Sequence, residues 1–226
     1  MEGALWRPSA NFGARRDGLR PSLIVLHHTA MHSAEAALAR LCDAGAEAPV
    51  SCHYVIAEDG RVWQLVREAD RAWHAGLGQW GGLGDVNSRS IGIELANPAP
   101  NPFAEPQMAR LESLLSQLLD RWAIAPERVI GHSDMAPGRK ADPGPKFDWR
   151  RLARQGLSVW PEAPGPEGEE VPLLQSLARF GYPVEDPEPV REAFRMRFRP
   201  WALGRAEEPD DRRVAAALAA RWPWVG

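Results

Sequence analysis

The sequence predicts an α/β fold with a mixed central β-sheet flanked by helices, followed by a small three-helix C-terminal domain. Short continuous apolar runs, typical of buried strands, alternate with stretches whose apolar residues recur at helical spacing. A segment rich in Pro, Gly and Glu then separates these elements from the C-terminal part. The 226 residues are therefore expected to form a first domain (1–160), a linker (161–172) and a helical domain (173–226).

The strands of the predicted sheet are short. Residues 22–26 (SLIVL) form an apolar run that ends at a pair of histidines, His27 and His28. Residues 52–57 and 61–66 flank a Glu-Asp-Gly turn, a pattern typical of a β-hairpin. Residues 90–96 (SIGIELA) form a strand with one acid, Glu94, and residues 129–132 form another. Because strands and helices interleave while one pair is a hairpin, the sheet is expected to be mixed.

Helices are predicted between and after these strands. Ser33 is a suitable cap for a helix that extends through about residue 41, and Asp148 opens a short helix. Residues 171–180, 188–198 and 209–222 are expected to be the three helices of the C-terminal domain. The longest helix, over residues 105–122, has an apolar stripe at steps of three and four: Met108, Leu111, Leu115, Leu118 and Trp122.

Composition and charge narrow the classes of function. Hydrophobic residues make up 44% of the chain and charged residues 25%, as in ordinary soluble globular proteins. The formal net charge is −3, so no overall positive field attracts nucleic acid. No apolar run approaches the roughly 18 residues of a membrane span. Cys42 and Cys52 are too few for a disulfide framework and are expected to be free thiols.

The N-terminal residues lack the basic segment and following apolar segment of an export signal. A cytoplasmic location is therefore expected, with the periplasm as the alternative if a signal has been removed from this N-terminus. The sequence leaves the oligomeric state open.

Two histidines occupy matching positions after predicted strands. His27 and His132 each follow a short apolar run, and Asp142 lies beyond His132 in a Gly- and Pro-rich loop that can fold back. A catalytic zinc ion takes three protein ligands and keeps one position open for water, so these residues are candidate ligands. Spacing alone also fits another interpretation, in which the histidines are structural, Glu94 faces solvent and Lys140 is an ordinary loop residue.

Five blocks of sequence occur in order: IVLHHTA (24–30), SCHYVI (51–56), AWHAG (72–76), SIGIEL (90–95) and GHSDMAPGRKADPGP (131–145). Over about residues 20–160 they resemble the zinc-dependent N-acetylmuramoyl-L-alanine amidases of the type 2 family. Within that family the chain is similar to bacterial members that cut muropeptides, including the 1,6-anhydro form. The C-terminal domain, with AFRMRF at 193–198, resembles the three-helix peptidoglycan-binding-like domain.

The resemblance implies hydrolysis of the amide bond between N-acetylmuramic acid, including its 1,6-anhydro form, and L-alanine in peptidoglycan fragments, for recycling or turnover. It places Zn²⁺ on His27, His132 and Asp142. Glu94 matches the general base, and Lys140 matches the cation that stabilises the oxyanion. The expected binding partners are peptidoglycan or muropeptide fragments. Further residues are expected to support the site or contact the substrate: His53, Trp73, His74, Trp80, Asn87 and Arg139.

Three alternatives compete with this hypothesis. Related peptidoglycan-recognition proteins keep the fold, lack the zinc site and only bind the wall, but this chain has all three ligands together with Glu94 and Lys140. A lytic wall hydrolase would differ in compartment and substrate size. An adaptor built on the C-terminal domain would leave the first domain unexplained.

Arg195, Arg197 and Arg199 alternate with apolar residues in the C-terminal domain. These arginines fit two interpretations: they bind acidic stem peptides of the wall, or they dock the domain onto acids of the first domain. A domain of about 55 residues buries little apolar surface alone. We therefore expect docking.

Overall fold

The computed structural model describes residues 3–162 and 171–225. β4 (Tyr54–Ile56) and β5 (Val62–Gln64) are antiparallel, whereas the other described neighbours in the main sheet are parallel, so the predicted mixed sheet is confirmed. β2 (Phe12–Gly13) and β6 (Arg71–Ala72) form a separate antiparallel pair. The main sheet has the order β1 (Leu5–Trp6), β5 (Val62–Gln64), β4 (Tyr54–Ile56), β7 (Ser90–Leu95), β3 (Leu23–His28) and β8 (Val129–Gly131).

Most helices lie where the sequence predicts them. The Ser33 hydroxyl accepts a hydrogen bond from the Ala36 N–H at 3.1 Å and caps α1 (Ala34–Leu41). Asp148 caps α5 (Trp149–Arg154) in the same way. α3 has the predicted bounds (Glu105–Trp122). The other helices of the described parts are α2 (Val86–Arg89), α4 (His132–Met135), α6 (Leu173–Phe180), α7 (Pro187–Phe198) and α8 (Pro209–Arg221), with 3-10 turns at Arg16–Gly18, Pro126–Arg128 and Pro200–Ala202.

Several elements of two to four residues are not predicted, because they contain too little of any periodic pattern. β1, β2, β6 and α2 belong to this group. The strand expected over residues 129–132 ends at Gly131, and His132 opens α4 instead. The linker expected at 161–172 falls largely on residues 163–170, which lie outside the described residues.

Strand alternation assigns the sheet residues to two faces. Leu26 of β3 and Ile93 of β7 share an apolar cluster with the buried side of α3, whereas Val25 belongs to a different cluster. His27 and Glu94 are partners in the register of β3 and β7. Both follow the alternation away from α3, so they point to the same face of the sheet, opposite α3.

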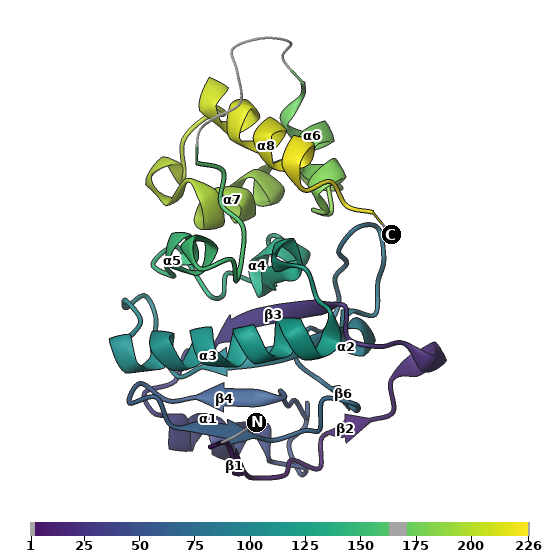
Figure 1. Ribbon diagram of the computed structural model, residues 1–226, viewed down its shortest axis with the longest axis vertical. Coiled ribbons are helices and arrows are strands. Elements are labelled where there is room, and N and C mark those ends of the chain that lie inside the picture. Colours follow the sequence, from purple (N-terminus) through teal and green to yellow (C-terminus); the bar gives the residue numbers. More distant parts are fainter. Residues whose placement is uncertain (1–2, 163–170, 226) are drawn as a thin grey trace.

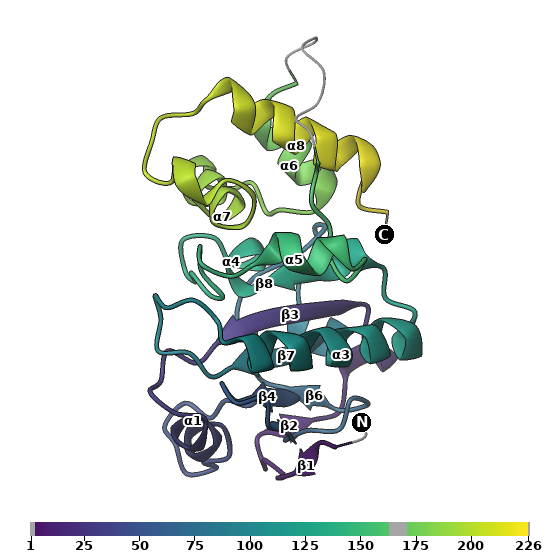
Figure 2. The ribbon, with the colours of Figure 1, turned by 60° about the vertical axis from the view of Figure 1, so that its left-hand side comes forward.

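The C-terminal helices pack on the first domain beyond edge strand β8. Figures 1 and 2 show α4 and α5 between β8 and the layer of α6, α7 and α8. One apolar cluster contains residues from both domains. The Trp80 ring of the first domain lies 5.7 Å from the ring of Phe180 and 5.0 Å from that of Tyr182, between centroids. The C-terminal domain therefore docks as expected.

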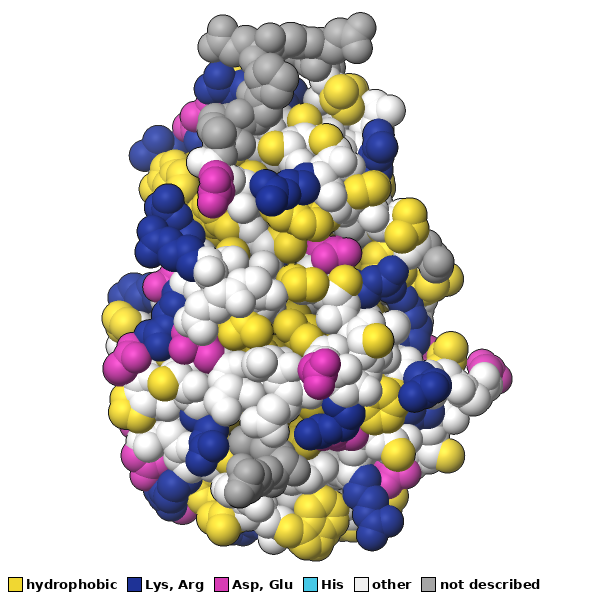
Figure 3. Space-filling model, viewed as in Figure 1, with side chains coloured by type: hydrophobic (Ala, Val, Ile, Leu, Met, Phe, Trp, Pro, Cys, Tyr) yellow, Lys and Arg dark blue, Asp and Glu magenta, His cyan; other side chains and the backbone are white. Residues whose placement is uncertain are grey.

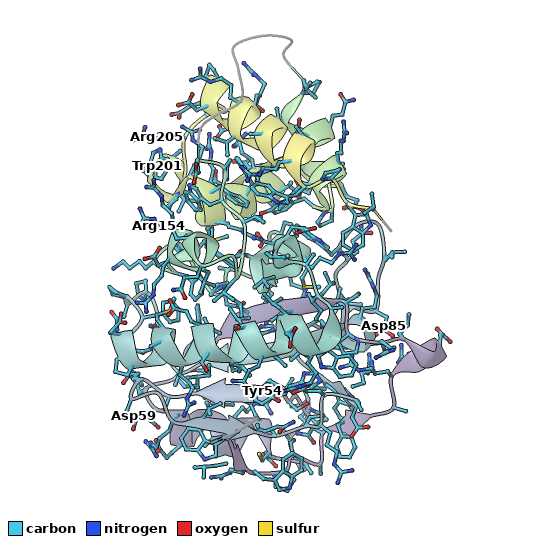
Figure 4. All side chains as sticks on the ribbon, viewed as in Figure 1. Tyr54, Asp59, Asp85, Arg154, Trp201 and Arg205 are labelled. Carbon is cyan, nitrogen blue, oxygen red and sulfur yellow. The ribbon has the colours of Figure 1, made fainter. Side chains whose placement is uncertain are left out.

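The surface carries charges of both signs. Acidic and basic side chains are interspersed on the face shown in Figure 3, and no histidine is visible on that face. Figure 4 labels Arg154, Trp201 and Arg205 along one edge of the upper half. Cys42 and Cys52 form no disulfide, as predicted. Within residues 3–162 and 171–225, no helix combines the length and apolar character needed to cross a membrane.

Candidate metal centre and active site

Strand register brings the predicted metal ligands together. Leu26 of β3 pairs with Gly131 of β8, so the next residues, His27 and His132, lie side by side. Their Nδ1 atoms are 2.9 Å apart, and Oδ2 of Asp142 lies 2.9 Å from the first and 3.0 Å from the second. The three side chains are largely buried, with exposed fractions of 2%, 4% and 12%.

A chain of hydrogen bonds behind His27 determines which ring nitrogen carries the proton. The Ser90 hydroxyl lies 2.5 Å from the Val86 carbonyl oxygen and donates to it, because a carbonyl oxygen only accepts. Ser90 Oγ therefore accepts from Nε2–H of His74 at 3.1 Å. Nδ1 of His74 is then left to accept from Nε2–H of His27 at 3.0 Å. Nδ1 of His27 consequently presents a lone pair.

The second histidine is oriented in the same sense. Nε2–H of His132 donates to the Ala75 carbonyl at 2.8 Å, an outer contact typical of metal-binding histidines. Burial, together with the nearby His132 ring, lowers the pKa of His27 to about 4, so this ring is neutral near pH 7. Two imidazole lone pairs and one oxygen of Asp142 therefore meet at a single point.

This donor set suits a zinc ion. Acceptor atoms that face one another repel unless a cation lies between them. In tetrahedral zinc with bonds of about 2.0–2.2 Å, ligand atoms are roughly 3.3 Å apart, so a small expansion of the cluster accommodates Zn²⁺. Among the described residues, His27, His132 and Asp142 form a group whose ligand atoms all lie within 4.8 Å of one another.

His74 packs directly on the sheet over Gly92. A Cβ added to Gly92 would lie 2.4 Å from Cγ of the His74 ring, so only glycine leaves room for this ring. The side-chain oxygen of Asn87 accepts from the backbone N–H of His74 at 3.0 Å and of Ala75 at 2.8 Å. Asn87 thus holds the backbone of the loop that carries His74 and Ala75, and His74 in turn supports His27.

His53 also supports the site from within the protein. It is fully buried, its Nδ1 accepts from the Gly92 N–H at 3.0 Å, and its Nε2 lies 3.1 Å from the Asp70 carbonyl oxygen. Burial, with the nearby Arg15, lowers the pKa of His53 to about 3. No sequence pattern singles out Arg15, yet its guanidinium binds the backbone carbonyls of Glu68, of Asn87 and Ser88 in α2, and of Ser90 at the start of β7.

Glu94 lies beside the metal centre and lines a cavity of about 130 Å³. Its Oε2 is buried and has no hydrogen-bond partner. Burial and the charge of Asp142 raise the pKa of Glu94 to about 8, and the charge of Lys140 opposes this rise. A poorly solvated carboxyl group without a partner is suited to exchange protons with a reacting molecule.

The remaining predicted contacts differ in accessibility. Trp73 is half-buried and Arg139 is exposed, with its guanidinium bound to the carbonyls of Ala75 and Leu77. The expectation that Trp80 contacts the substrate is wrong, because only 1% of this residue is exposed. The C-terminal domain covers Trp80. The sequence does not show this contact, because a Trp in a Gly-rich loop is expected at the surface.

Comparison with known proteins agrees with the geometry. The profile of the N-acetylmuramoyl-L-alanine amidase family matches residues 17–145. The chain is 35% identical over 236 residues to the N-acetylmuramoyl-L-alanine amidase AmiD of Escherichia coli (strain K12), covering 90% of this chain and 84% of AmiD. It is 34% identical over 167 residues to the 1,6-anhydro-N-acetylmuramyl-L-alanine amidase AmpD of the same organism, covering 67% of this chain and 91% of AmpD.

Solved structures extend the similarity across both domains. AmiD from E. coli, in complex with the substrate anhydro-N-acetylmuramic acid-L-Ala-D-γ-Glu-L-Lys, superimposes with a TM-score of 0.80 at 34% identity over 92% of both chains. AmpDh3 of Pseudomonas aeruginosa gives a TM-score of 0.79 at 29% identity over 96% of both chains. From its sequence profile, its fold and the geometry of its site, the chain belongs to the N-acetylmuramoyl-L-alanine amidase family.

Proposed function

We propose that this enzyme uses one Zn²⁺ to hydrolyse the amide bond between N-acetylmuramic acid, including its 1,6-anhydro form, and L-alanine in peptidoglycan fragments. The observation that carries the proposal is the convergence of three lone pairs beside the unpartnered carboxyl group of Glu94. Relatives support the substrate class, since AmiD was solved with an anhydro-N-acetylmuramic acid peptide as its substrate. The activity would serve recycling or turnover of peptidoglycan.

Each residue of the centre has a defined task in this proposal. Zn²⁺ held by His27, His132 and Asp142 would supply a Lewis acid that polarises the scissile carbonyl and lowers the pKa of water. The positive charge of the bound ion would favour the carboxylate form of Glu94. This carboxylate takes a proton from the attacking water and passes it to the leaving nitrogen of L-alanine as the C–N bond breaks. Lys140 stabilises the negative charge on the former carbonyl oxygen.

We place the reacting bond between the three metal ligands and Glu94, next to the cavity that Glu94 lines. Thr29, Met31 and Val50 contribute to its lining. We retain Trp73 as a contact for a sugar face, because an indole ring offers a flat apolar surface. We retain Arg139 as a contact for a stem-peptide carboxylate. Of the other expected contacts, His53, His74 and Asn87 have supporting roles in this proposal.

The proposal also includes the domain boundaries at residues 160 and 172. It includes a cytoplasmic location as well. The periplasm is the alternative location. Cell fractionation tests the compartment: native protein in the cytoplasmic fraction supports it, and native protein in the periplasmic fraction contradicts it.

Product analysis tests the proposed reaction. Metal-free protein, with and without added Zn²⁺, is incubated in parallel with anhydro-muropeptides and with purified sacculi, and the products are identified by mass spectrometry. We expect zinc-dependent release of intact stem peptide from the soluble fragments. Cleavage at a different bond, or binding without cleavage, would contradict the proposal. The yield from sacculi shows whether the polymer is also cut.

A further inference from the structure

The C-terminal domain reaches the metal centre through one acid, Asp134. Asp134 is the third residue of α4, the helix that begins at His132, and it is fully buried. Its Oδ2 accepts a hydrogen bond from the backbone N–H of Gly131 at 2.8 Å, which fixes the step from β8 into α4. The position of the ligand His132 therefore depends on how Asp134 is held.

Two side chains of the C-terminal domain hold Asp134. The Tyr182 hydroxyl donates to its Oδ1 at 2.5 Å, and the Arg197 guanidinium donates to its Oδ2 at 2.8 Å. The side chains of Arg197 and Asp134 are each 1% exposed. A carboxylate this deeply buried requires a charged partner, and here that partner comes from the other domain.

Arg197 also holds the beginning of β8. Its second terminal nitrogen donates to the Val129 carbonyl at 3.0 Å and to the Ser158 hydroxyl at 3.2 Å. Among the described strands, β8 has β3 as its sole neighbour, so groups on its outer edge need partners from elsewhere. Arg197 thus contacts β8 at Val129 and, through Asp134, at its end.

The same region contains the ligand Asp142. The Arg197 guanidinium lies 4.2 Å from the ring centroid of Trp149. Trp149 and Pro143, the residue after Asp142, both pack so closely on Gly131 that a Cβ there would lie 3.3 Å and 2.9 Å from them. The segments that carry His132 and Asp142 therefore pack together on one side of this guanidinium.

We propose that Arg197 and Tyr182 are positioning residues for the metal centre, and that the C-terminal domain holds two of the three ligands in place. The proposal rests on the zinc site of the proposed function. The neighbouring arginines provide a contrast, because Arg195 and Arg199 both pair with Asp211 inside the C-terminal domain.

The test compares Arg197→Met with Arg195→Met in the full chain. Each substitution removes a buried guanidinium whose acid keeps another partner, Tyr182 in the first case and Arg199 in the second. Zinc affinity is measured by competition with a chelator at a temperature where circular dichroism shows both variants folded. The d–d absorption of the Co²⁺-substituted proteins reports the ligand geometry. We expect Arg197→Met to weaken zinc binding about 10–100-fold and to change the Co²⁺ spectrum, whereas Arg195→Met does neither.

Equal zinc affinities in the two variants, whether unchanged or weakened, would overturn the inference. Failure of the wild-type protein to bind zinc would instead overturn the proposed function. If Arg197→Met does not fold, Tyr182→Phe takes its place, because it removes only the hydroxyl group that donates to Asp134. We expect a smaller loss of zinc affinity in the same direction, and unchanged affinity with an unchanged Co²⁺ spectrum would also overturn the inference.

Discussion

The two sides of the proposed metal centre are supported in different ways. His27 lies on β3 inside the sheet, between β7 and β8, and its ring is fixed by a short relay through His74 and Ser90. His132 and Asp142 lie beyond edge strand β8, and side chains of the C-terminal domain reach the segment that carries them.

This difference follows from the position of each strand. A strand with neighbours on both sides has its backbone groups bound by the sheet. An edge strand leaves a row of groups without partners, and in this enzyme the C-terminal domain lies on that side of the sheet (Figure 2). In the proposed zinc site, His27 thus has local support, whereas the segment that carries His132 and Asp142 is contacted by the C-terminal domain.

Removing an edge ligand should have the largest effect. Asp142→Ala leaves two imidazoles, which is too few protein ligands for a catalytic zinc site. We expect loss of stoichiometric zinc by metal analysis and loss of amidase activity. Retention of one zinc per chain with full activity would show that Asp142 is not a ligand.

Glu94, on the central side, should affect turnover without affecting the metal. Glu94→Gln keeps the size of the side chain but removes the base. We expect turnover to fall about 10²–10⁴-fold, with zinc content and substrate binding unchanged. Near-normal turnover in a steady-state assay would assign the base to another residue.

Truncation after Glu162 should destabilise the edge side. It removes half of an apolar cluster that includes Trp80 and exposes the outer side of β8. We expect the melting temperature to fall by about 10 °C or more, with lower activity on small fragments. A truncated protein that keeps both properties and loses binding to sacculi would show that the domain mainly holds the wall.

The pH dependence of stability should report the raised pKa of Glu94. A carboxyl group whose pKa rises on folding adds stability below its unfolded pKa, and this stability is lost as pH increases through the folded value of about 8. Metal-free Glu94→Gln should therefore be more stable than wild-type protein at pH 8, by roughly 4 kcal/mol. The advantage should disappear near pH 5. Denaturant titrations at pH 5 and pH 8 measure the free energy of unfolding of the two proteins. An equal difference between them at both pH values would show that the raised pKa of Glu94 is not its cause.

The relay behind His27 should give the smallest effect. Ser90→Ala removes the acceptor of the His74 Nε2–H and relaxes the orientation of His27. We expect zinc affinity to fall about tenfold. Ser88→Ala is a suitable control, because the Ser88 hydroxyl binds the Arg16 N–H outside the relay. Equal affinities of the two variants would show that the relay does not tune the metal site.

The residues of the candidate site itself could largely be predicted from sequence. The apolar runs place His27 and His132 after strands, and the apolar stripe gives α3 its bounds. Through the family resemblance, the sequence blocks predict Asp142, Glu94 and Lys140 as partners of these histidines. The strand and helix patterns involve residues that are close in the sequence, and the sequence blocks belong to a family resemblance that spans the whole site.

The support of the edge side could not be predicted. Arg197 and Asp134 are 63 residues apart, and no pattern in the chain pairs them. The alternation of arginines with apolar residues over 195–199 does not show that Arg197 binds the first domain while Arg195 and Arg199 pair within the C-terminal domain. Likewise, the sequence does not show which way the side chain of a histidine in one of the blocks points. The side chain of His53 is bound to backbone groups inside the protein.

The most direct test of zinc-dependent amidase function is a titration of metal-free protein with Zn²⁺. Release of stem peptide from an anhydro-muropeptide is measured at each addition. The three-ligand site formed by His27, His132 and Asp142 predicts that activity rises linearly and reaches its plateau at one zinc per chain. Full activity in the metal-free protein, or a titration that never restores cleavage, would contradict the account.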